Sequence, residues 1–396
     1  MNRSRISLIM SAIATGMLCI SSCGGIGSDN GCVTLDCSNV ADGGTLAFSQ
    51  LAYEPEFVAL DSDTLAAFGS MVGAYLISDN YIVKDATSIV NTAEVKVFDR
   101  HTGKFVCNVG HIGRGPGEYL CSFQTFVDEP GGKVWIMDAP DHIKTYDIRT
   151  GKYLGDVPLA HEVMAEYGTA SASYSVSPED GTLTVFAVPY EEDPCPALAW
   201  CQDVEGNVLW EIPETGRERR REPSNTLISS SFNVGGAFDV ALSSGGSWPD
   251  TLYVLDGNEL SSVFTVDTRT LKDGQSVQSE LLPGKVLSAL IEQKEYMPGI
   301  YIGEYVARVL TDLKTGKSVR YALEFENDFL GITFEWATFG NGWLILPVPA
   351  VDFLEIGRNA LDKGLLSGDA AAQVEAILSD LRDTDNDILM LARLKR

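Results

Sequence analysis

The chain reads Val95-Lys-Val-Phe-Asp-Arg-His-Thr-Gly-Lys-Phe105, and this phrase returns twice more. The second copy is Ile143-Lys-Thr-Tyr-Asp-Ile-Arg-Thr-Gly-Lys-Tyr153, and the third is Val309-Leu-Thr-Asp-Leu-Lys-Thr-Gly-Lys317. Altered copies follow the same scheme around Asp203 and Asp267. Each phrase joins two β-rich runs by an Asp-x-x-Thr-Gly turn, as a β-hairpin does. A hairpin that returns about every 45 to 65 residues is typical of a β-propeller with one such hairpin in each blade.

Further short runs of β-branched and aromatic residues, bounded by Gly, Asn, Asp or Pro, surround these hairpins. They predict an all-β fold in which residues 45–396 form a six-bladed β-propeller. The sixth blade is expected to contain the runs Ile332–Thr338 and Gly342–Val348. A short C-terminal helical insertion is expected before the strand that closes the ring.

A single apolar stripe predicts this helix. Val374, Ile377, Leu378 and Leu381 recur at the spacing of one helix face, and Asp369 stands where an N-cap belongs. The helix is therefore expected to begin at Asp369.

The run Ile388–Leu394 then reads as a strand. An open ring of blades would leave exposed strand edges, which invite aggregation. We therefore expect the last blade to use both ends of the chain. Its N-terminal strand would be Thr45–Phe48 or Phe57–Leu60.

The first residues have the pattern of a signal peptide, expected to span residues 1–22. Arg3 and Arg5 precede an apolar run that is too short to span a bilayer. The sequence Ile20-Ser-Ser-Cys23 resembles a bacterial lipobox, which implies cleavage before Cys23 and a lipid on its thiol. Residues 23–44 would then be a flexible tether. An ordinary signal peptide with an incidental cysteine is the alternative.

The composition is acidic and suits an exported, anchored protein. Asp and Glu number 55 against 29 Lys and Arg, and the net charge is −26. Loss of Arg3 and Arg5 with the signal changes it to −28. Nucleic acid is thus an unexpected partner, because phosphate binding needs a basic face. A cationic ligand or bound calcium is the alternative to a merely solubilising charge. No cofactor is expected.

Six cysteines remain after Cys19 leaves with the signal and Cys23 is lipidated. In an oxidising compartment they can form disulfides, and sequence proximity suggests three local pairs. Zinc is the competing interpretation, but no Cys-x-x-Cys occurs, so no metal site is predicted. The three pairs are Cys32–Cys37, Cys107–Cys121 and Cys195–Cys201.

The segment Gly110-His-Ile-Gly-Arg-Gly-Pro-Gly-Glu-Tyr119 resembles a junction found in six-bladed β-propeller lipoproteins of Bacteroides-type bacteria. Ser177-Pro-Glu-Asp-Gly181 is similar to a turn of TolB-like blades, and NHL-repeat propellers are more distant relatives. The resemblance covers roughly residues 45–396. It implies the six-bladed architecture and a place in the cell envelope. Members are mostly described by their fold, so it implies no particular activity.

Four residues are candidates for ligand binding. Arg114, at the mouth of a central channel, could hold an anionic ligand, with Glu118 and His111 beside it. The competing interpretation is that this glycine-rich junction only guides the chain from one blade to the next. Trp248 follows a Gly/Ser-rich loop and could stack on a sugar ring, or pack in the core.

No catalytic set is recognised, since there is no Gly-x-Ser-x-Gly elbow and only four histidines occur without metal-ligand spacing. We therefore expect a non-catalytic binding or interaction module, lipid-anchored to the outer membrane on its periplasmic or surface face. Its ligand would be an unknown protein, peptide or glycan. The alternatives are an enzyme that uses channel carboxylates on carbohydrates or peptides, and a scaffold of an envelope complex.

Overall fold

The computed structural model describes twelve stretches of the chain. The chain divides into two compact units, Met1–Cys32 and Val33–Arg396, and the sheets belong to the second. The described residues are 31–68, 73–85, 93–163, 165–166, 169–170, 172–187, 195–213, 227–229, 232–234, 238–243, 251–297 and 300–396.

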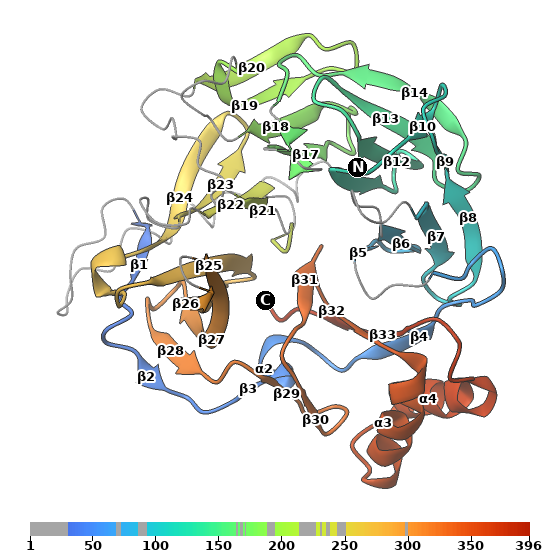
Figure 1. Ribbon diagram of the computed structural model, residues 1–396, viewed down its shortest axis with the longest axis vertical. Helices are drawn as coiled ribbons and strands as arrows, with labels where there is room; N and C mark the ends of the chain where they lie inside the picture. Colours follow the sequence, from blue (N-terminus) through green and yellow to red (C-terminus); the bar gives the residue numbers. More distant parts are fainter. Residues whose placement is uncertain are drawn as a thin grey trace, which may run out of the picture. The chain divides into compact units, whose positions relative to one another are not determined.

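Antiparallel sheets succeed one another around a ring in the second unit (Figure 1). Each of the first three blades is a four-stranded sheet in which consecutive strands are neighbours, as in other propellers. The strands are β5 (Ala74–Ile77), β6 (Tyr81–Asp85), β7 (Val95–Asp99) and β8 (Phe105–Val109) in the first blade; β11 (Gln124–Asp128), β12 (Lys133–Met137), β13 (His142–Asp147) and β14 (Tyr153–Pro158) in the second; and β17 (Ala172–Val176), β18 (Leu183–Ala187), β19 (Ala197–Gln202) and β20 (Val208–Pro213) in the third.

The fourth and fifth blades each gain a fifth strand from the N-terminal residues. Two short strands, β1 (Val33–Leu35) and β2 (Ala41–Asp42), pair in parallel with the outer strands of these blades. Both lie within the segment expected to be a tether, so this part of it is bound to the propeller. The blades themselves contain β21 (Leu227–Ser229), β22 (Phe238–Ser243), β23 (Thr251–Asp256) and β24 (Glu259–Val266), then β25 (Gln275–Leu282), β26 (Lys285–Met297), β27 (Ile300–Asp312) and β28 (Ser318–Tyr321).

A small three-stranded sheet of β3 (Leu46–Ala47), β29 (Phe325–Asn327) and β30 (Ile332–Phe334) follows the fifth blade (Figure 1). The run Ile332–Thr338 was expected to be one strand of the sixth blade. It is interrupted after Phe334, and the Arg308 guanidinium donates to the Glu335 carbonyl at this break. With this sheet the ring has seven blades, so the prediction of six is wrong.

The last blade is built from both ends of the chain, as predicted. Its strand order is β31 (Thr338–Gly340), β32 (Trp343–Val348), β33 (Ile388–Arg393) and β4 (Glu56–Ala59). The C-terminal strand β33 therefore lies between β32 and the N-terminal strand β4, with hydrogen bonds to both.

The insertion between β32 and β33 contains two helices, α3 (Ala350–Asp362) and α4 (Gly368–Asp380). The predicted helix is α4, but its N-cap is Ser367 and not Asp369. Helix α3 was not predicted. No helix in the described ranges combines the length and apolar character needed to cross a bilayer.

The remaining short elements are α2 (Phe48–Leu51), the 3₁₀ turn η2 (Thr268–Thr270), β9 (His111–Ile112) with β10 (Glu118–Tyr119), and β15 (Ala165–Glu166) with β16 (Thr169–Ala170).

Residues 33–59 form what we call the N-terminal strap. Its four strands pair in turn with β24, β28, β29 and β33, which belong to four successive sheets. The first three pairings are parallel and the last is antiparallel. The strap thus covers strand edges that would otherwise be open to other chains.

The repeated Asp-x-x-Thr-Gly phrase forms a tight turn between the third and outer strands of a blade. In the first blade the Asp99 carboxylate accepts hydrogen bonds from the Thr102 backbone N–H and hydroxyl at 2.8 and 2.7 Å. The Gly103 N–H donates to the Asp99 carbonyl at 2.8 Å. Asp147 and Thr150 repeat this arrangement in the second blade, and Asp312 and Thr315 repeat the carboxylate contacts in the fifth.

The turn glycine also touches the preceding blade. A Cβ built on Gly103 would lie 1.8 Å from the Ala59 carbonyl oxygen, and one on Gly151 would lie 1.7 Å from that of Asn108. The carbonyl of Gly151 accepts the Gly110 N–H at 2.8 Å. At Gly316 nothing lies within 4 Å, although φ is +68° there and +66° at Gly151. The turns at Gly103 and Gly151 therefore act as joints that pack against the backbone of the preceding blade, whereas the turn at Gly316 makes no such contact.

A charged side chain is fully buried between the first and last blades. Lys84, on β6, is fully buried, and within the described part of the chain its Nζ has no hydrogen-bond partner. It lies 4.0 Å from the centroid of the Tyr75 ring, whose hydroxyl donates to the Asp387 carboxylate at 2.8 Å. Burial lowers the pKa of Lys84 to about 8, and the charges of Asp387 and Asp85 offset part of this effect.

Lys84→Met should raise the free energy of unfolding at pH 7 by about 1–3 kcal/mol, because it removes a buried ammonium that has no hydrogen-bond partner among the described residues and whose burial cost is only partly offset by the Tyr75 ring and by the charges of Asp387 and Asp85. In the wild type, burial of the charged Lys84 lowers the free energy of unfolding by its full amount below about pH 8. Between about pH 8 and 10.5 the folded chain has lost this proton and the unfolded chain still keeps it, so the free energy of unfolding rises with pH. Denaturant unfolding across this pH range should show the rise in the wild type and not in the variant.

Lys96→Met is the matched control, with the opposite sign expected. Lys96 is also buried, but its Nζ donates to the Leu65 carbonyl at 2.7 Å and to the Asn108 side chain at 2.9 Å. Its loss leaves these acceptors without the ammonium and should destabilise the fold. A Lys84→Met chain less stable than the wild type at pH 7 would show that the Tyr75 ring outweighs the burial penalty.

Candidate functional site

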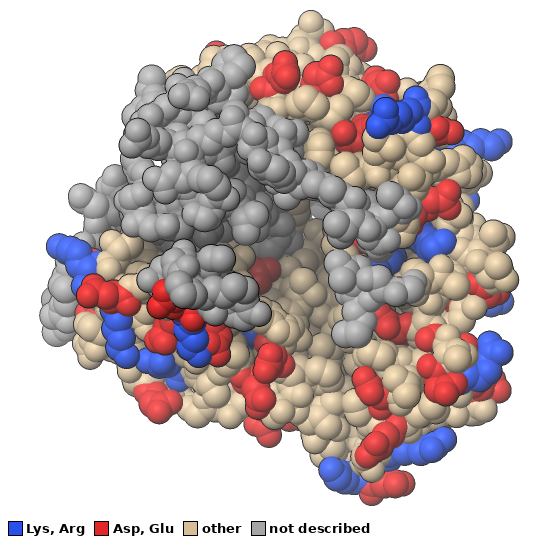
Figure 2. Space-filling model, in the orientation of Figure 1, with Lys and Arg blue, Asp and Glu red and all other residues tan. Residues whose placement is uncertain are grey.

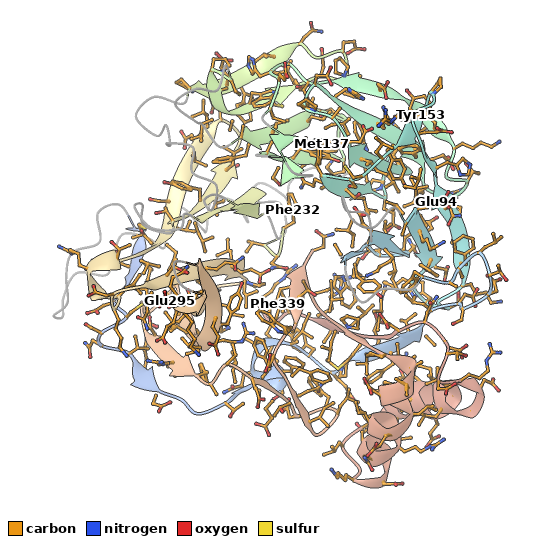
Figure 3. All side chains as sticks on the ribbon, viewed as in Figure 1. Glu94, Met137, Tyr153, Phe232, Glu295 and Phe339 are labelled. Atoms are coloured by element: carbon orange, nitrogen blue, oxygen red, sulfur yellow. The ribbon has the colours of Figure 1, made fainter. Side chains whose placement is uncertain are left out.

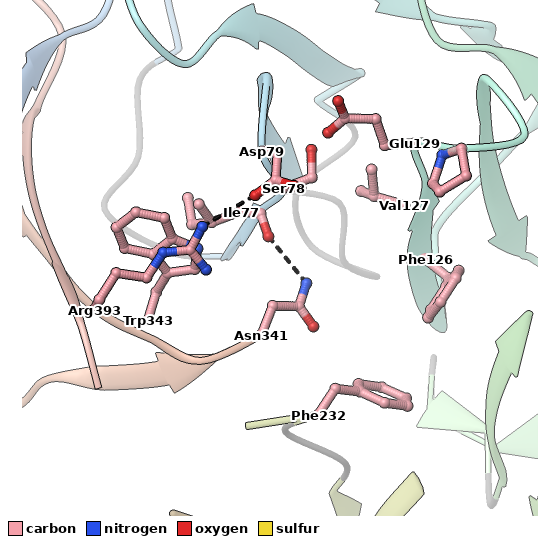
Figure 4. A pocket seen from close by; sticks show the side chains of 11 residues that line it. Ile77, Ser78, Asp79, Phe126, Val127, Glu129, Phe232, Asn341, Trp343 and Arg393 are labelled. Carbon is pink, nitrogen blue, oxygen red and sulfur yellow. Dashed lines mark hydrogen bonds and ion pairs between the residues drawn. The ribbon is translucent and has the colours of Figure 1, made fainter. Parts of the chain in front are cut away.

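A pocket of about 460 Å³ is lined by residues of the first, second, fourth and last blades (Figure 4). The strands β5, β11 and β31 are each an edge strand of their sheet, and the turns that follow them contribute Asp79, Glu129 and Asn341. We call this site the inner-strand pocket. Its lining is apolar at Ile77, Phe126, Val127, Pro130, Phe232 and Trp343, and polar or charged at Ser78, Asp79, Glu129, Asn341 and Arg393.

Trp343 forms part of the wall and offers little of its ring to a ligand. The guanidinium carbon of Arg393 lies 3.8 Å from the ring centroid, and that of Arg100 lies 4.9 Å from it. Only 5% of Trp343 is exposed. The ring therefore holds two cations in place and is not a stacking surface.

An ion pair stands beside this wall. Arg393 Nη2 lies 3.0 Å from Asp79 Oδ1, and the two side chains are 49% and 81% exposed. Asn341 fixes the same turn by donating to the Ile77 carbonyl at 3.1 Å (Figure 4). Because an exposed pair contributes at most about 1 kcal/mol, a charged ligand could replace either partner at little cost.

Glu129 is held as a carboxylate on another side of the pocket. Burial alone would raise its pKa, but hydrogen bonds from the Ser78 side chain, the backbone and side chain of Asn80, and the Asp79 backbone together lower it. The Asn80 N–H donates to Glu129 Oε2 at 3.0 Å. Glu129 is therefore ionised at neutral pH and is unsuited to donate a proton.

Two phenylalanines supply an apolar surface away from the ion pair (Figure 4). The ring centroids of Phe126 and Phe232 lie 5.7 Å apart at 74°, the edge-to-face geometry that aromatic pairs favour. Figure 3 places Phe232 towards the middle of the ring of sheets, together with Phe339. The pocket thus combines an apolar surface with two carboxylates and one guanidinium.

The residues predicted from the glycine-rich junction do not line this pocket. The junction follows β8, the outermost strand of the first blade, and Figure 3 shows Glu94 and Tyr153 at the periphery of the ring there. His111 Nδ1 lies 3.0 Å from the Glu94 carboxylate. Glu118 Oε2 accepts the Gly115 N–H at 2.7 Å, so it stabilises the loop itself.

Arg114 is exposed on this peripheral loop and lies away from the inner-strand pocket. Ligand binding by Arg114, Glu118 and His111 stays a prediction. Trp248 and Cys23 lie outside the described residues.

The pocket residues carried no sequence signal of their own, because Asp79, Glu129 and Arg393 lie in ordinary turns and strand ends that only the closure of the ring brings together.

None of the three predicted disulfides is formed among the described residues. Cys201 is part of the extended strand β19 and Cys195 lies just before its start, so at about 3.3 Å per residue they are on the order of 20 Å apart, too far for a bridge. Cys107 instead donates to the Ile148 carbonyl of the next blade, with a sulfur–oxygen distance of 3.4 Å. Cys121 is beyond the junction, and Cys32 and Cys37 flank β1. Across the described ranges, no three His, Cys, Asp or Glu side chains are arranged to hold a metal ion.

Comparison with known proteins gives one family and a shared fold. The family model described as "Domain of unknown function (DUF4934)" matches residues 32–393. None of the functionally curated proteins matches the chain significantly. A crystal structure of a Bacteroides fragilis protein, described as exported, has a TM-score of 0.58 at 16% identity, and the match covers 90% of this chain and 98% of that one.

Two more distant solved structures are also similar in part. Hydrazine synthase of Kuenenia stuttgartiensis has a TM-score of 0.39 at 13% identity, with 83% of this chain and 90% of that one covered. The Pan2 WD40 domain of Neurospora crassa has a TM-score of 0.36 at 11% identity, with 71% and 74% covered. Of these three structures, only the Bacteroides fragilis protein has a TM-score above 0.5, and at its low identity the match bears on the fold alone and supports a propeller.

Proposed function

We propose that this chain, which belongs to the DUF4934 family, is an exported and lipid-anchored β-propeller that binds a cationic, partly apolar ligand in the inner-strand pocket without changing it chemically. The observation that carries the proposal is the chemistry of the pocket. The carboxylates of Asp79 and Glu129 share it with the apolar surface of Phe126 and Phe232. A lysine or arginine side chain of a peptide has the matching form, an aliphatic stem that ends in a cation.

The same groups argue for binding and against acid–base catalysis in this pocket. A hydrolase of sugars needs a carboxylic acid whose pKa is raised enough to donate a proton. The pKa of Glu129 is lowered, and Asp79 is paired with Arg393. The pocket therefore offers fixed negative charge and no proton donor of this kind.

The charge of the whole chain favours such a ligand as well. With a net charge of −26, the protein attracts cations over distances longer than a direct contact. On the face shown in Figure 2, acidic side chains are spread around the coloured surface, and basic ones occur in small groups, several of them next to acidic ones. Binding should weaken as salt is added.

Capped tripeptides with a central lysine, arginine or glutamate test this proposal by isothermal titration calorimetry. We expect the basic peptides to bind and the acidic one to fail. Glu129→Gln and Asp79→Asn should each weaken the binding about tenfold, which corresponds to about 1.4 kcal/mol. Glu375→Gln, on the exposed surface of α4, is the control and should bind like the wild type. Equal binding of the acidic peptide, or none of the basic ones, would contradict the proposal.

Export and anchoring are proposed on separate grounds. Residues 1–22 have the composition of a signal peptide, Cys23 stands at a lipobox-like position, and the similar Bacteroides fragilis protein is described as exported. The mature chain would begin at Cys23 and be held on the outer membrane, on its periplasmic or surface face. Mass spectrometry of the protein from membranes should find an acylated N-terminal Cys23 peptide, and an intact Met1 terminus would overturn the assignment.

A further inference from the structure

Trp336 differs from the other described tryptophans in its exposure. Trp135, Trp200 and Trp343 are 1%, 0% and 5% exposed and Trp210 is partly buried, whereas Trp336 is 52% exposed. It lies in the link between β30 and β31. Asn341, which lines the inner-strand pocket, follows the other end of β31, so Trp336 belongs to a separate surface.

The exposed ring is held firmly by its neighbours. The Tyr305 ring meets it edge to face, with centroids 4.6 Å apart at 88°. The Tyr305 hydroxyl donates to the Gln278 side-chain oxygen at 2.8 Å, which fixes the orientation of that ring on β27. A fixed aromatic ring that is half exposed loses little conformational entropy when a ligand stacks on it.

A buried arginine supports the same ring. The Arg308 guanidinium lies 5.7 Å from the Trp336 centroid and 4.0 Å from that of Phe325, and only 6% of Arg308 is exposed. Its Nε donates to the Leu323 carbonyl at 2.8 Å, and its Nη2 donates to the Glu335 carbonyl beside Trp336. The backbone of the link and the tryptophan ring are thus positioned by one cation.

We propose that Trp336, with Tyr305 at its side, is a stacking platform for a pyranose ring of a neutral oligosaccharide. The C–H face of a pyranose is apolar and flat enough to cover an indole, and its hydroxyls remain free for solvent or for nearby polar groups. A cationic ligand is disfavoured here because Arg308 already brings positive charge to the ring. An anionic ligand is disfavoured by the net charge of −26.

Calorimetry of the full chain with cellohexaose, laminarihexaose and mannohexaose tests the platform, with hexagalacturonate as the charged comparison. At least one neutral hexasaccharide should bind, and hexagalacturonate should bind more weakly. Trp336→Ala should lower the affinity at least tenfold, and Trp336→Phe should lower it less. Tyr53→Ala is the matched control, because Tyr53 is another aromatic residue with 56% exposure. It should leave the affinity unchanged.

The outcome is independent of the inner-strand pocket. Glu129→Gln should weaken the basic peptides and leave the hexasaccharides unaffected, so failure of one site is distinguishable from failure of the other. Absence of binding by all three neutral hexasaccharides would overturn the platform. So would a Trp336→Ala chain that binds them like the wild type while its unfolding midpoint is unchanged.

Discussion

A chain that ends at Asn386 is expected to show no cooperative unfolding transition by circular dichroism or calorimetry. The missing residues include all of β33, which lies between β32 and β4 in the last blade. Ile388, Leu389, Met390 and Leu391 are 0% exposed. At about 1.5–3 kcal/mol for each large apolar side chain, their loss removes on the order of 10 kcal/mol, as much as the whole stability of a typical domain.

Removal of the residues 33–40 is the control for this truncation. It also deletes a strand, but β1 is at the edge of its sheet and makes three parallel pairs there. The loss of the buried Leu35 should lower the unfolding midpoint, and a cooperative transition should persist. If the chain that ends at Asn386 unfolds cooperatively near the wild-type midpoint, the ring does not depend on its C-terminal strand.

Gly151→Ala is expected to destabilise the protein by at least 3 kcal/mol, whereas Gly316→Ala should cost about 1 kcal/mol. Both glycines end an Asp-x-x-Thr-Gly turn, with nearly the same positive φ, so the backbone strain of an alanine is the same at both. The two sites differ in what the new Cβ meets. At Gly151 it meets the Asn108 backbone of the preceding blade, which cannot move aside without opening the joint.

Urea unfolding of the two variants, measured together, separates these contributions. Gly103→Ala should behave like Gly151→Ala, because its Cβ would meet the Ala59 carbonyl oxygen. Equal losses of stability at Gly151 and Gly316 would show that the positive φ accounts for the whole effect and that the turns do not act as joints.

The parts of the fold that could be predicted were those with a local signal. The hairpin phrase recurs because each copy satisfies its own turn, through the Asp99 or Asp147 carboxylate and the threonine that follows it. The closing strand Ile388–Arg393 was recognisable as an apolar run, and the need to close the ring gave it a partner. Both predictions rest on residues that are neighbours in the sequence.

The remaining features depend on contacts between distant residues. The seventh sheet was missed because Ile332–Thr338 looks like one continuous β run, and the break after Phe334 involves an arginine on another blade. The inner-strand pocket was missed for the same reason. Its charged groups come from Asp79, Glu129 and Arg393, which belong to three different sheets. The sequence instead favoured the glycine-rich junction as a ligand site, although this junction lies at the periphery of the ring.

The N-terminal strap has a kinetic consequence for the order in which this chain can fold. Val33 pairs with Phe264, Ala41 with Val319 and Phe57 with Met390, so the first strands to be synthesised pair with strands that are made much later, and β4 pairs with the last strand of all. Such a high contact order predicts slow folding, and no intermediate on a ribosome can complete the ring. The ring can therefore close only after the final residues have emerged, although each of the first three blades consists of strands that are consecutive in the sequence.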